Sequence, residues 1–140
     1  MGIVAGTLFV AALIVWARLD AWLDLKKLER QTKRHLNAAE LQQWATNLLT
    51  RHWAQHQRWE EYYGPNFYNS TNFPSDLRKV GCFSDGMRIL IDTQQRDVAV
   101  FGTTKDGPWL QVGAPSLAAP TNQTFIQWKP GIYFVRAVLP

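Results

Sequence analysis

The sequence predicts an α+β fold: an N-terminal hydrophobic helix continues into an amphipathic helix, a second helix follows, and a small antiparallel β-sheet ends the chain. Three observations support this prediction. The first 17 residues carry no charged side chain. Between residues 19 and 49, apolar side chains recur at helical spacing among charged neighbours. The last third alternates β-branched runs with turn residues, which is typical of a meander and a hairpin.

The composition suits one modest domain with one additional segment, because the chain has 140 residues of which 46% are hydrophobic. Its formal net charge of +4 is concentrated locally. Six basic residues lie between positions 18 and 34: Arg18, Lys26, Lys27, Arg30, Lys33 and Arg34. A single cysteine, Cys82, excludes an intrachain disulfide and a metal cluster made only of cysteines.

The run from Gly2 to Ala17 has the composition of a membrane-spanning helix. It contains 16 residues and would be about 24 Å long as a helix, against a bilayer hydrocarbon thickness of roughly 30 Å. Trp16 is an amphipathic ring suited to the headgroup boundary, and Arg18 can extend its guanidinium toward water. Trp22 belongs to an apolar stripe that continues into the interface. We therefore expect a membrane anchor over residues 1–17 in a slightly thinned bilayer.

Two alternatives for this segment fit less well. A cleavable signal peptide has a basic region before the apolar run and a small-residue cleavage site after it. Here no lysine or arginine comes before the run, and no such site follows Trp16. A buried helix of a soluble protein normally has a polar face, and Thr7 is the only polar side chain in the run. A retained membrane segment is the favoured interpretation.

Residues 18–36 are expected to form a basic amphipathic stalk helix that continues the anchor out of the membrane. Its basic side chains have two candidate partners, nucleic acid and anionic lipid headgroups. A nucleic-acid surface would need interleaved aromatic side chains or a recognition motif, whereas the flank of a membrane helix needs only headgroups. We therefore expect the lipid bilayer as the partner and no nucleic acid. The predicted membrane-interface residues are Trp16, Arg18, Trp22, Lys26, Lys27 and Arg30.

The segment 37–140 is expected to form one small α+β domain. It begins with a helix at about 38–56, because Asn37 and Glu40 form a capping-box-like start and apolar residues follow at positions 41, 44, 45, 48 and 49. Residues 57–86 are rich in aromatics, Asn, Pro and Gly, which favours an ordered surface loop. Within that loop, residues 74–81 are expected to form one helical turn.

Antiparallel strands are expected over residues 87–139. Two β-branched runs, 87–93 and 97–101, are joined by a short polar connection, and a third strand follows at 109–112. Two further strands, 124–128 and 132–139, flank a turn in which Pro130 and Gly131 suit the central positions of type II. These patterns predict a meander followed by a hairpin.

Two histidines provide the best candidate for a metal site. His52 and His56 are four residues apart and share one face of the second helix, and Glu60 or Glu61 would have to complete the ligand set. The spacing is common by chance, and the H-E-x-x-H pattern is absent. We therefore predict no metal ligand and no cofactor.

The remaining chemical candidates are weaker. Cys82, Asp85 and the distant His35 lack the local signature of a nucleophile, which favours a buried structural thiol. The chain has seven tryptophans, and aromatic side chains of this kind can stack on sugars or nucleobases. Most of them, however, suit the membrane interface, the second helix or the strands. We predict no catalytic residue, no small-molecule substrate and no enzymatic activity.

The order of elements resembles the layout of type IV pilins and pseudopilins, in which a hydrophobic N-terminal helix continues into an amphipathic half that packs on a small antiparallel sheet. That family has a glutamate at the fifth mature position and a basic leader ending in glycine. Counted from Ile3, the fifth position here is Thr7, and no lysine or arginine lies upstream. The resemblance concerns layout: it implies assembly through the hydrophobic helix and transfers no functional residue.

The function expected from the sequence is that of a single-pass membrane protein whose C-terminal domain mediates interactions and performs no chemistry. The alternative is a pilin-like filament or secretion-apparatus subunit assembled through the same helix. Protein partners or self-association are expected in both cases. The basic residues after the apolar run predict a cytoplasmic C-terminal domain by the positive-inside rule. The pilin-like layout instead predicts an extracytoplasmic domain or a filament.

Overall fold

The computed structural model describes residues 2–55, 60–63, 75–80, 87–91, 97–102 and 107–137. Within these ranges the helices are α1 (Gly2–His35), α2 (Ala38–Gln55) and α4 (Ser75–Lys79). The strands are β1 (Glu60–Tyr63), β2 (Met87–Ile91), β3 (Asp97–Gly102), β4 (Trp109–Gly113), β5 (Gln123–Lys129) and β6 (Ile132–Ala137). The predicted α+β layout of a long N-terminal helix, a second helix and an antiparallel sheet is confirmed.

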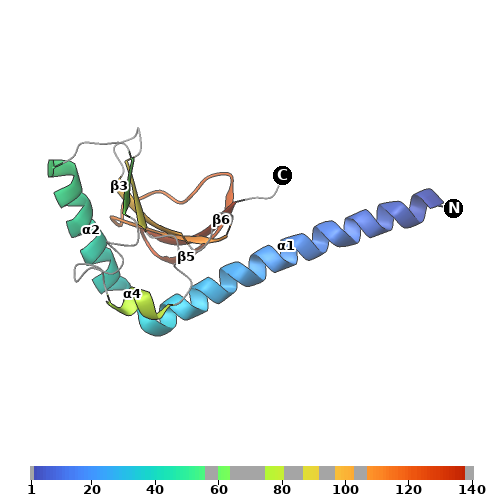
Figure 1. Ribbon diagram of the computed structural model, residues 1–140, viewed down its shortest axis with the longest axis horizontal. Coiled ribbons are helices and arrows are strands. Elements are labelled where there is room, and N and C mark those ends of the chain that lie inside the picture. The colour runs from blue at the N-terminus through green and yellow to red at the C-terminus, as the bar shows by residue number, and fades with distance from the viewer. Residues whose placement is uncertain are drawn as a thin grey trace.

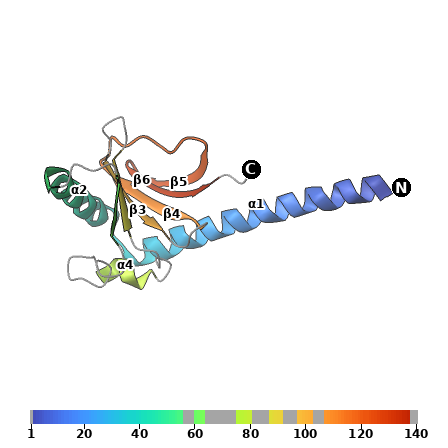
Figure 2. The same cartoon turned by 45° about the horizontal axis from the view of Figure 1, so that its top comes forward.

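α1 is one continuous helix, and its N-terminal half extends well beyond the rest of the molecule (Figure 1). Its 34 residues correspond to a length of about 51 Å. Lys33, Arg34 and His35 occupy its last turn, where positive charge interacts favourably with the helix dipole. The C-terminal half of α1 runs along the sheet, so the helix has a packed half and a projecting half (Figures 1 and 2).

Asn37 caps the start of α2. Its Oδ1 accepts a hydrogen bond of 3.1 Å from the backbone N–H of Glu40, and its carbonyl accepts the first helical bond, of 3.0 Å, from Leu41. This is the cap that the sequence predicts. Only Leu36 and Asn37 separate the two helices, and α2 stands at the end of the sheet farthest from the N-terminus (Figure 1).

The sheet has six strands in the order β1-β2-β3-β4-β6-β5, and every neighbouring pair is antiparallel. β2, β3 and β4 form the predicted meander. β5 and β6 form the predicted hairpin, which joins the sheet through β6, so that β5 lies at an edge.

The expectation of a loop over residues 57–86 needs a correction at Glu60–Tyr63, which form β1 and pair with β2. Residues 60–63 read EEYY and have no alternation of apolar and polar side chains, so the strand follows from backbone pairing with β2 and not from a local pattern. The helical turn expected within 74–81 is present as α4.

The hydrophobic core lies between the sheet and the three helices. It contains side chains from α1, α2, α4 with the residue after it, and strands β3, β4 and β6: Leu25, Leu28, Leu41, Ala45, Leu48, Leu49, Leu77, Val80, Ala99, Phe101, Leu110, Val112, Ile132 and Phe134. Trp44 and Trp128 pack at its border, with ring centroids 6.0 Å from Phe101 and 5.9 Å from Phe134. Both tryptophans therefore have structural positions.

The expected stalk over residues 18–36 does not stand clear of the domain. Leu25 and Leu28 are 0% and 1% exposed and belong to the same core as the sheet residues. The apolar stripe in this half of α1 is therefore covered by protein, because an amphipathic helix buries its apolar stripe against another apolar surface. The folded unit begins within α1.

The turn between β5 and β6 fastens the hairpin to α2. Gly131 has a φ of +87°, as the second central position of a type II turn requires. A Cβ at this position would clash with the backbone of Ala114. Glycine is therefore also needed because the turn lies so close to Ala114. The Nε2 of Gln42 donates hydrogen bonds to the carbonyls of Gly113 (2.9 Å) and Pro130 (2.8 Å).

Candidate membrane-anchoring site

The projecting half of α1 exposes apolar side chains along its length. The exposed large side chains in this half are Val4, Leu8, Phe9, Val10, Leu13, Ile14, Val15, Trp16, Leu19, Trp22 and Leu23, each at least 42% exposed. An 18-residue window of this helix has a mean hydropathy of 1.7, and none of it is buried within the protein. By length and composition, α1 is able to cross a membrane.

The predicted interface residues lie around the junction between the two halves of α1. Trp16 is 64% exposed and Trp22 is 42% exposed, so both rings are available to surrounding solvent or lipid. The Nζ of Lys26 lies 5.6 Å from the centroid of the Trp22 ring, a cation–π arrangement. Arg18 is also exposed and follows the apolar run directly.

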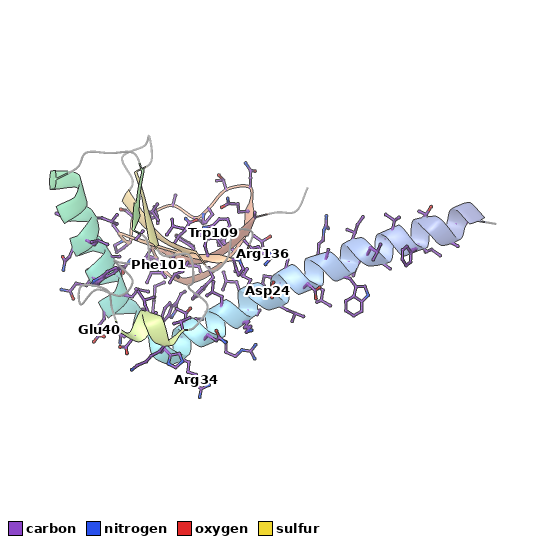
Figure 3. The ribbon with its side chains drawn as sticks, in the orientation of Figure 1. Asp24, Arg34, Glu40, Phe101, Trp109 and Arg136 are labelled. Carbon is purple, nitrogen blue, oxygen red and sulfur yellow. The ribbon has the colours of Figure 1, made fainter. Side chains whose placement is uncertain are left out.

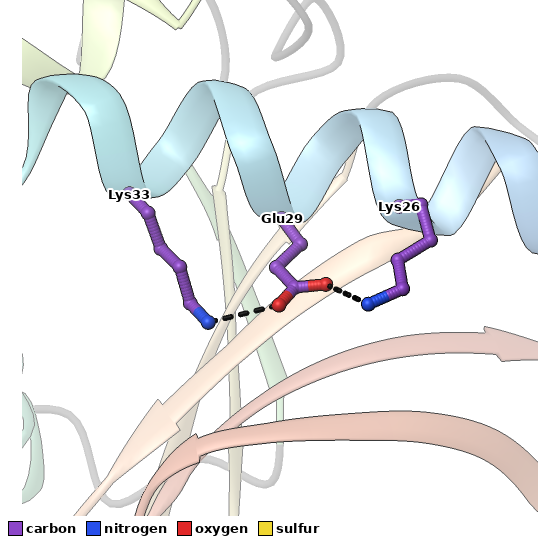
Figure 4. Close-up of polar contacts among 3 residues, drawn as sticks. All are labelled: Lys26, Glu29 and Lys33. Carbon is purple, nitrogen blue, oxygen red and sulfur yellow. Dashed lines mark hydrogen bonds and ion pairs between the residues drawn. The ribbon is translucent and has the colours of Figure 1, made fainter.

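Lys26 also takes part in a small ion-pair cluster on α1. Glu29 lies between Lys26 and Lys33, with contacts of 3.1 and 2.8 Å to their Nζ atoms (Figure 4). Glu29 lies 12 residues beyond the end of the apolar run at Ala17. Partial burial raises the pKa of Glu29, but the hydrogen bonds and charges of Lys33 and Lys26 outweigh it and keep the pKa below its ordinary value.

Lys27 and Arg30 complete the predicted set, and both side chains are exposed. Neither forms an ion pair with another residue in the described ranges. Two of the six predicted interface residues, Trp22 and Lys26, are therefore in contact with each other, and the others lie separately along α1.

An ion pair marks the place where the sheet meets α1. Asp24 Oδ2 lies 3.1 Å from a guanidinium nitrogen of Arg136, near the end of β6 (Figure 3). The neighbouring Leu25 is the first fully buried side chain among those described in α1. Leu25 follows Ala17 by eight residues of unbroken helix, a rise of about 12 Å. The apolar half is thus joined rigidly to the domain.

The other candidate side chains do not assemble into a site in the described part of the chain. His35 ends α1, and the backbone of His52 lies in α2. His56, Cys82 and Asp85 fall outside the described residues, and so do the side chains of Glu60 and Glu61. Across the described ranges, no group of three or more His, Cys, Asp or Glu side chains is placed to hold a metal ion.

Sequence reasoning missed the ion pair of Asp24 with Arg136, which joins α1 to the sheet. The two residues are 112 positions apart, and no local pattern connects them. Trp109, which the sequence assigns to a strand, donates its indole N–H to Gln111 Oε1 at 2.7 Å within β4. Comparisons with protein families, curated proteins and solved structures found no match for this chain.

Proposed function

We propose that this chain is a single-pass membrane protein in which α1 is the anchor and the α+β domain is an interaction module at the membrane surface. The observation that carries the proposal is the exposed apolar half of α1, which continues without a break into a helix half that belongs to the domain core. In water, an apolar surface of this length is unfavourable, and lipid is the environment that matches it.

The proposal gives the domain a binding role and no catalytic one. Three of its polar side chains have structural roles: Asn37 caps α2, Gln42 binds the carbonyls of Gly113 and Pro130, and Arg136 pairs with Asp24. A domain of this kind is suited to holding a partner protein close to the bilayer. We also propose that it faces the cytoplasm, on the basis of the basic residues that follow the apolar run.

The anchor is tested by flotation of the full-length chain with phospholipid vesicles. Val10 and Leu13 are 55% and 53% exposed, so replacing both with lysine leaves the domain core untouched. Each lysine near the middle of a membrane helix costs about 2.5–3.5 kcal/mol, which should move the variant from the vesicle fraction to the soluble or aggregated fraction. The matched control carries Val10→Ile and Leu13→Ile, which should float like the native chain. A native chain that stays soluble without detergent and does not float would refute the anchor.

The second candidate is a filament subunit whose α1 packs among copies of itself. The layout that favours it is a projecting apolar helix whose other half is packed on a small antiparallel sheet. In this case the chain would form fibres that electron microscopy detects in native membranes with an antibody to the domain. Dispersed single copies in the bilayer would support the anchor and contradict the filament.

A further inference from the structure

The junction between α1 and the sheet has a consequence for how the domain sits at a membrane. This inference rests on the proposed anchor. Because α1 is one helix from Gly2 to His35, the height of each of its residues above the bilayer follows from the helical rise. If the hydrocarbon layer ends near Ala17, the headgroup layer extends about 5–7 Å beyond it.

The end of the sheet lies at the level of Asp24, because Arg136 is bound to this residue. Asp24 is seven residues after Ala17, a rise of about 10 Å. Thr124 in β5 is the direct partner of Arg136 and shares this level. Residues 122 and 123 precede Thr124 and extend one to two strand positions, about 3–7 Å, beyond it, at the end of the hairpin that lies toward the projecting half of α1 (Figures 1 and 2). The start of β5 therefore reaches the outer boundary of the headgroups.

The exposed side chains at this end suit that position. Outside α1, Phe125 is the only exposed large apolar side chain in the described part of the chain, at 38%. It pairs with Val135 across β5 and β6, next to Thr124, and its ring meets the edge of Tyr133 at a centroid distance of 5.8 Å. An exposed phenylalanine at this end of the sheet can insert its ring at the headgroup boundary, as the apolar side chains of peripheral membrane elements do.

Arg18 lies on the side of α1 that faces this end of the sheet. It precedes Leu25 by seven residues, which is close to two full helical turns, so the two side chains share one face of the helix. Leu25 points into the core beneath the sheet. Arg18 is exposed and therefore projects into the corner between the bilayer surface and the sheet end, at the height of lipid phosphates.

We propose that the start of β5 and the end of β6, together with Phe125 and Arg18, form a surface that binds phospholipid headgroups and holds the domain against the bilayer. A tilt of about 20°, common for membrane helices, changes the height of this end by only a few ångströms, because α1 packs directly on β6. The domain then has one fixed lipid-facing end, and α2 at the opposite end is left for other partners (Figures 1 and 3).

The test measures the depth of two positions on the same strand. Full-length chains carrying Cys82→Ser and either Thr124→Cys or Lys129→Cys are labelled with a fluorophore and inserted into phosphatidylcholine and phosphatidylglycerol vesicles that contain a headgroup-bound quencher. Both native side chains are exposed, and their positions are about 17 Å apart along β5. Quenching at position 124 should be severalfold stronger than at position 129.

A lifted variant separates this contact from anchoring. Inserting seven helix-forming residues between Leu23 and Asp24 raises the domain by about 10 Å and nearly preserves its rotation about α1. Quenching at position 124 should then fall to the level at position 129, while flotation stays unchanged. Equal quenching at the two positions in the uninserted chain, or quenching at 124 that the insertion does not reduce, overturns the headgroup surface. Loss of flotation in the uninserted chain instead refutes the anchor itself.

Discussion

Thr32 is a buried polar side chain in the packed half of α1. It is 0% exposed, and its Oγ1 has no hydrogen-bond partner within the described part of the chain. Its backbone carbonyl is satisfied, because it accepts a 2.9 Å bond from the N–H of Leu36. The hydroxyl alone therefore carries a desolvation cost, which is about 1–3 kcal/mol for a buried unsatisfied group.

Replacing Thr32 with valine tests that cost. Thr32→Val keeps the shape and the β-branching of the side chain and removes the hydroxyl, so the free energy of unfolding should rise by about 1 kcal/mol. Denaturant titration of the full chain in detergent micelles measures the change. The matched control is Thr46→Val. Thr46 is exposed on α2, and its hydroxyl donates a 2.7 Å hydrogen bond to the carbonyl of Gln42. A loss of stability on Thr32→Val would mean that the hydroxyl has a partner that the folded chain requires.

At the scale of elements, the corner between α1 and α2 depends on Asn37. Asn37→Ala removes the hydrogen bond to the N–H of Glu40 and should lower the free energy of unfolding by about 1 kcal/mol, whereas Asn37→Asp should retain stability because a carboxylate also caps the helix. Asn47→Ala, at an exposed interior position of α2, is the control and should not destabilise the chain. Denaturant midpoints compare the three variants. Equal midpoints for Asn37→Ala and the native chain would contradict the importance of the cap.

The elements that sequence reasoning predicted correctly are those whose signals are local. Asn37 marks the start of α2 by its own side chain, and Gly131 marks the final hairpin because the turn needs a positive φ. β2, β3 and β4 follow from β-branched runs with short connections. In each case the chemistry that forms the element is contained within a few residues.

The elements that sequence reasoning missed depend on distant partners. β1 forms against β2, more than 20 residues later, and its own sequence lacks the alternation of a half-buried strand. The stripe that contains Leu25 and Leu28 would look the same whether it faced lipid, solvent or a sheet. Only the position of β6 beside α1 decides that it is covered by protein, and that contact is not encoded locally.

At the scale of the whole molecule, the candidate site was predicted in part. The apolar run and the exposed positions of Trp16, Arg18 and Trp22 could be anticipated from composition and from the charge boundary. The direct packing of α1 on the domain could not be anticipated, because it depends on the burial that begins at Leu25 and on the ion pair of Asp24 with Arg136. If α1 is the proposed anchor, this junction makes the height of the domain above the bilayer a property of the fold.

For the proposed anchor, the charge distribution of the whole chain predicts which side of the membrane the domain occupies. Six basic side chains follow the apolar run between positions 18 and 34, and the positive-inside rule gives such residues more weight than the acidic ones among them. The domain should therefore face the cytoplasm. Lys129 is exposed at the sheet end distant from the proposed lipid surface, which makes it a suitable reporter position.

In cells expressing the full-length chain with Cys82→Ser and Lys129→Cys, a membrane-impermeant maleimide should label position 129 only after permeabilisation. Inside-out vesicles from the same cells are the positive control, because they should be labelled without permeabilisation. A parallel chain with Cys82→Ser alone, which lacks cysteine altogether, gives the background signal. Labelling of intact cells at the level of permeabilised cells would place the domain outside the cytoplasm. That result would also favour the filament alternative, because the pilin-like layout requires an exterior domain.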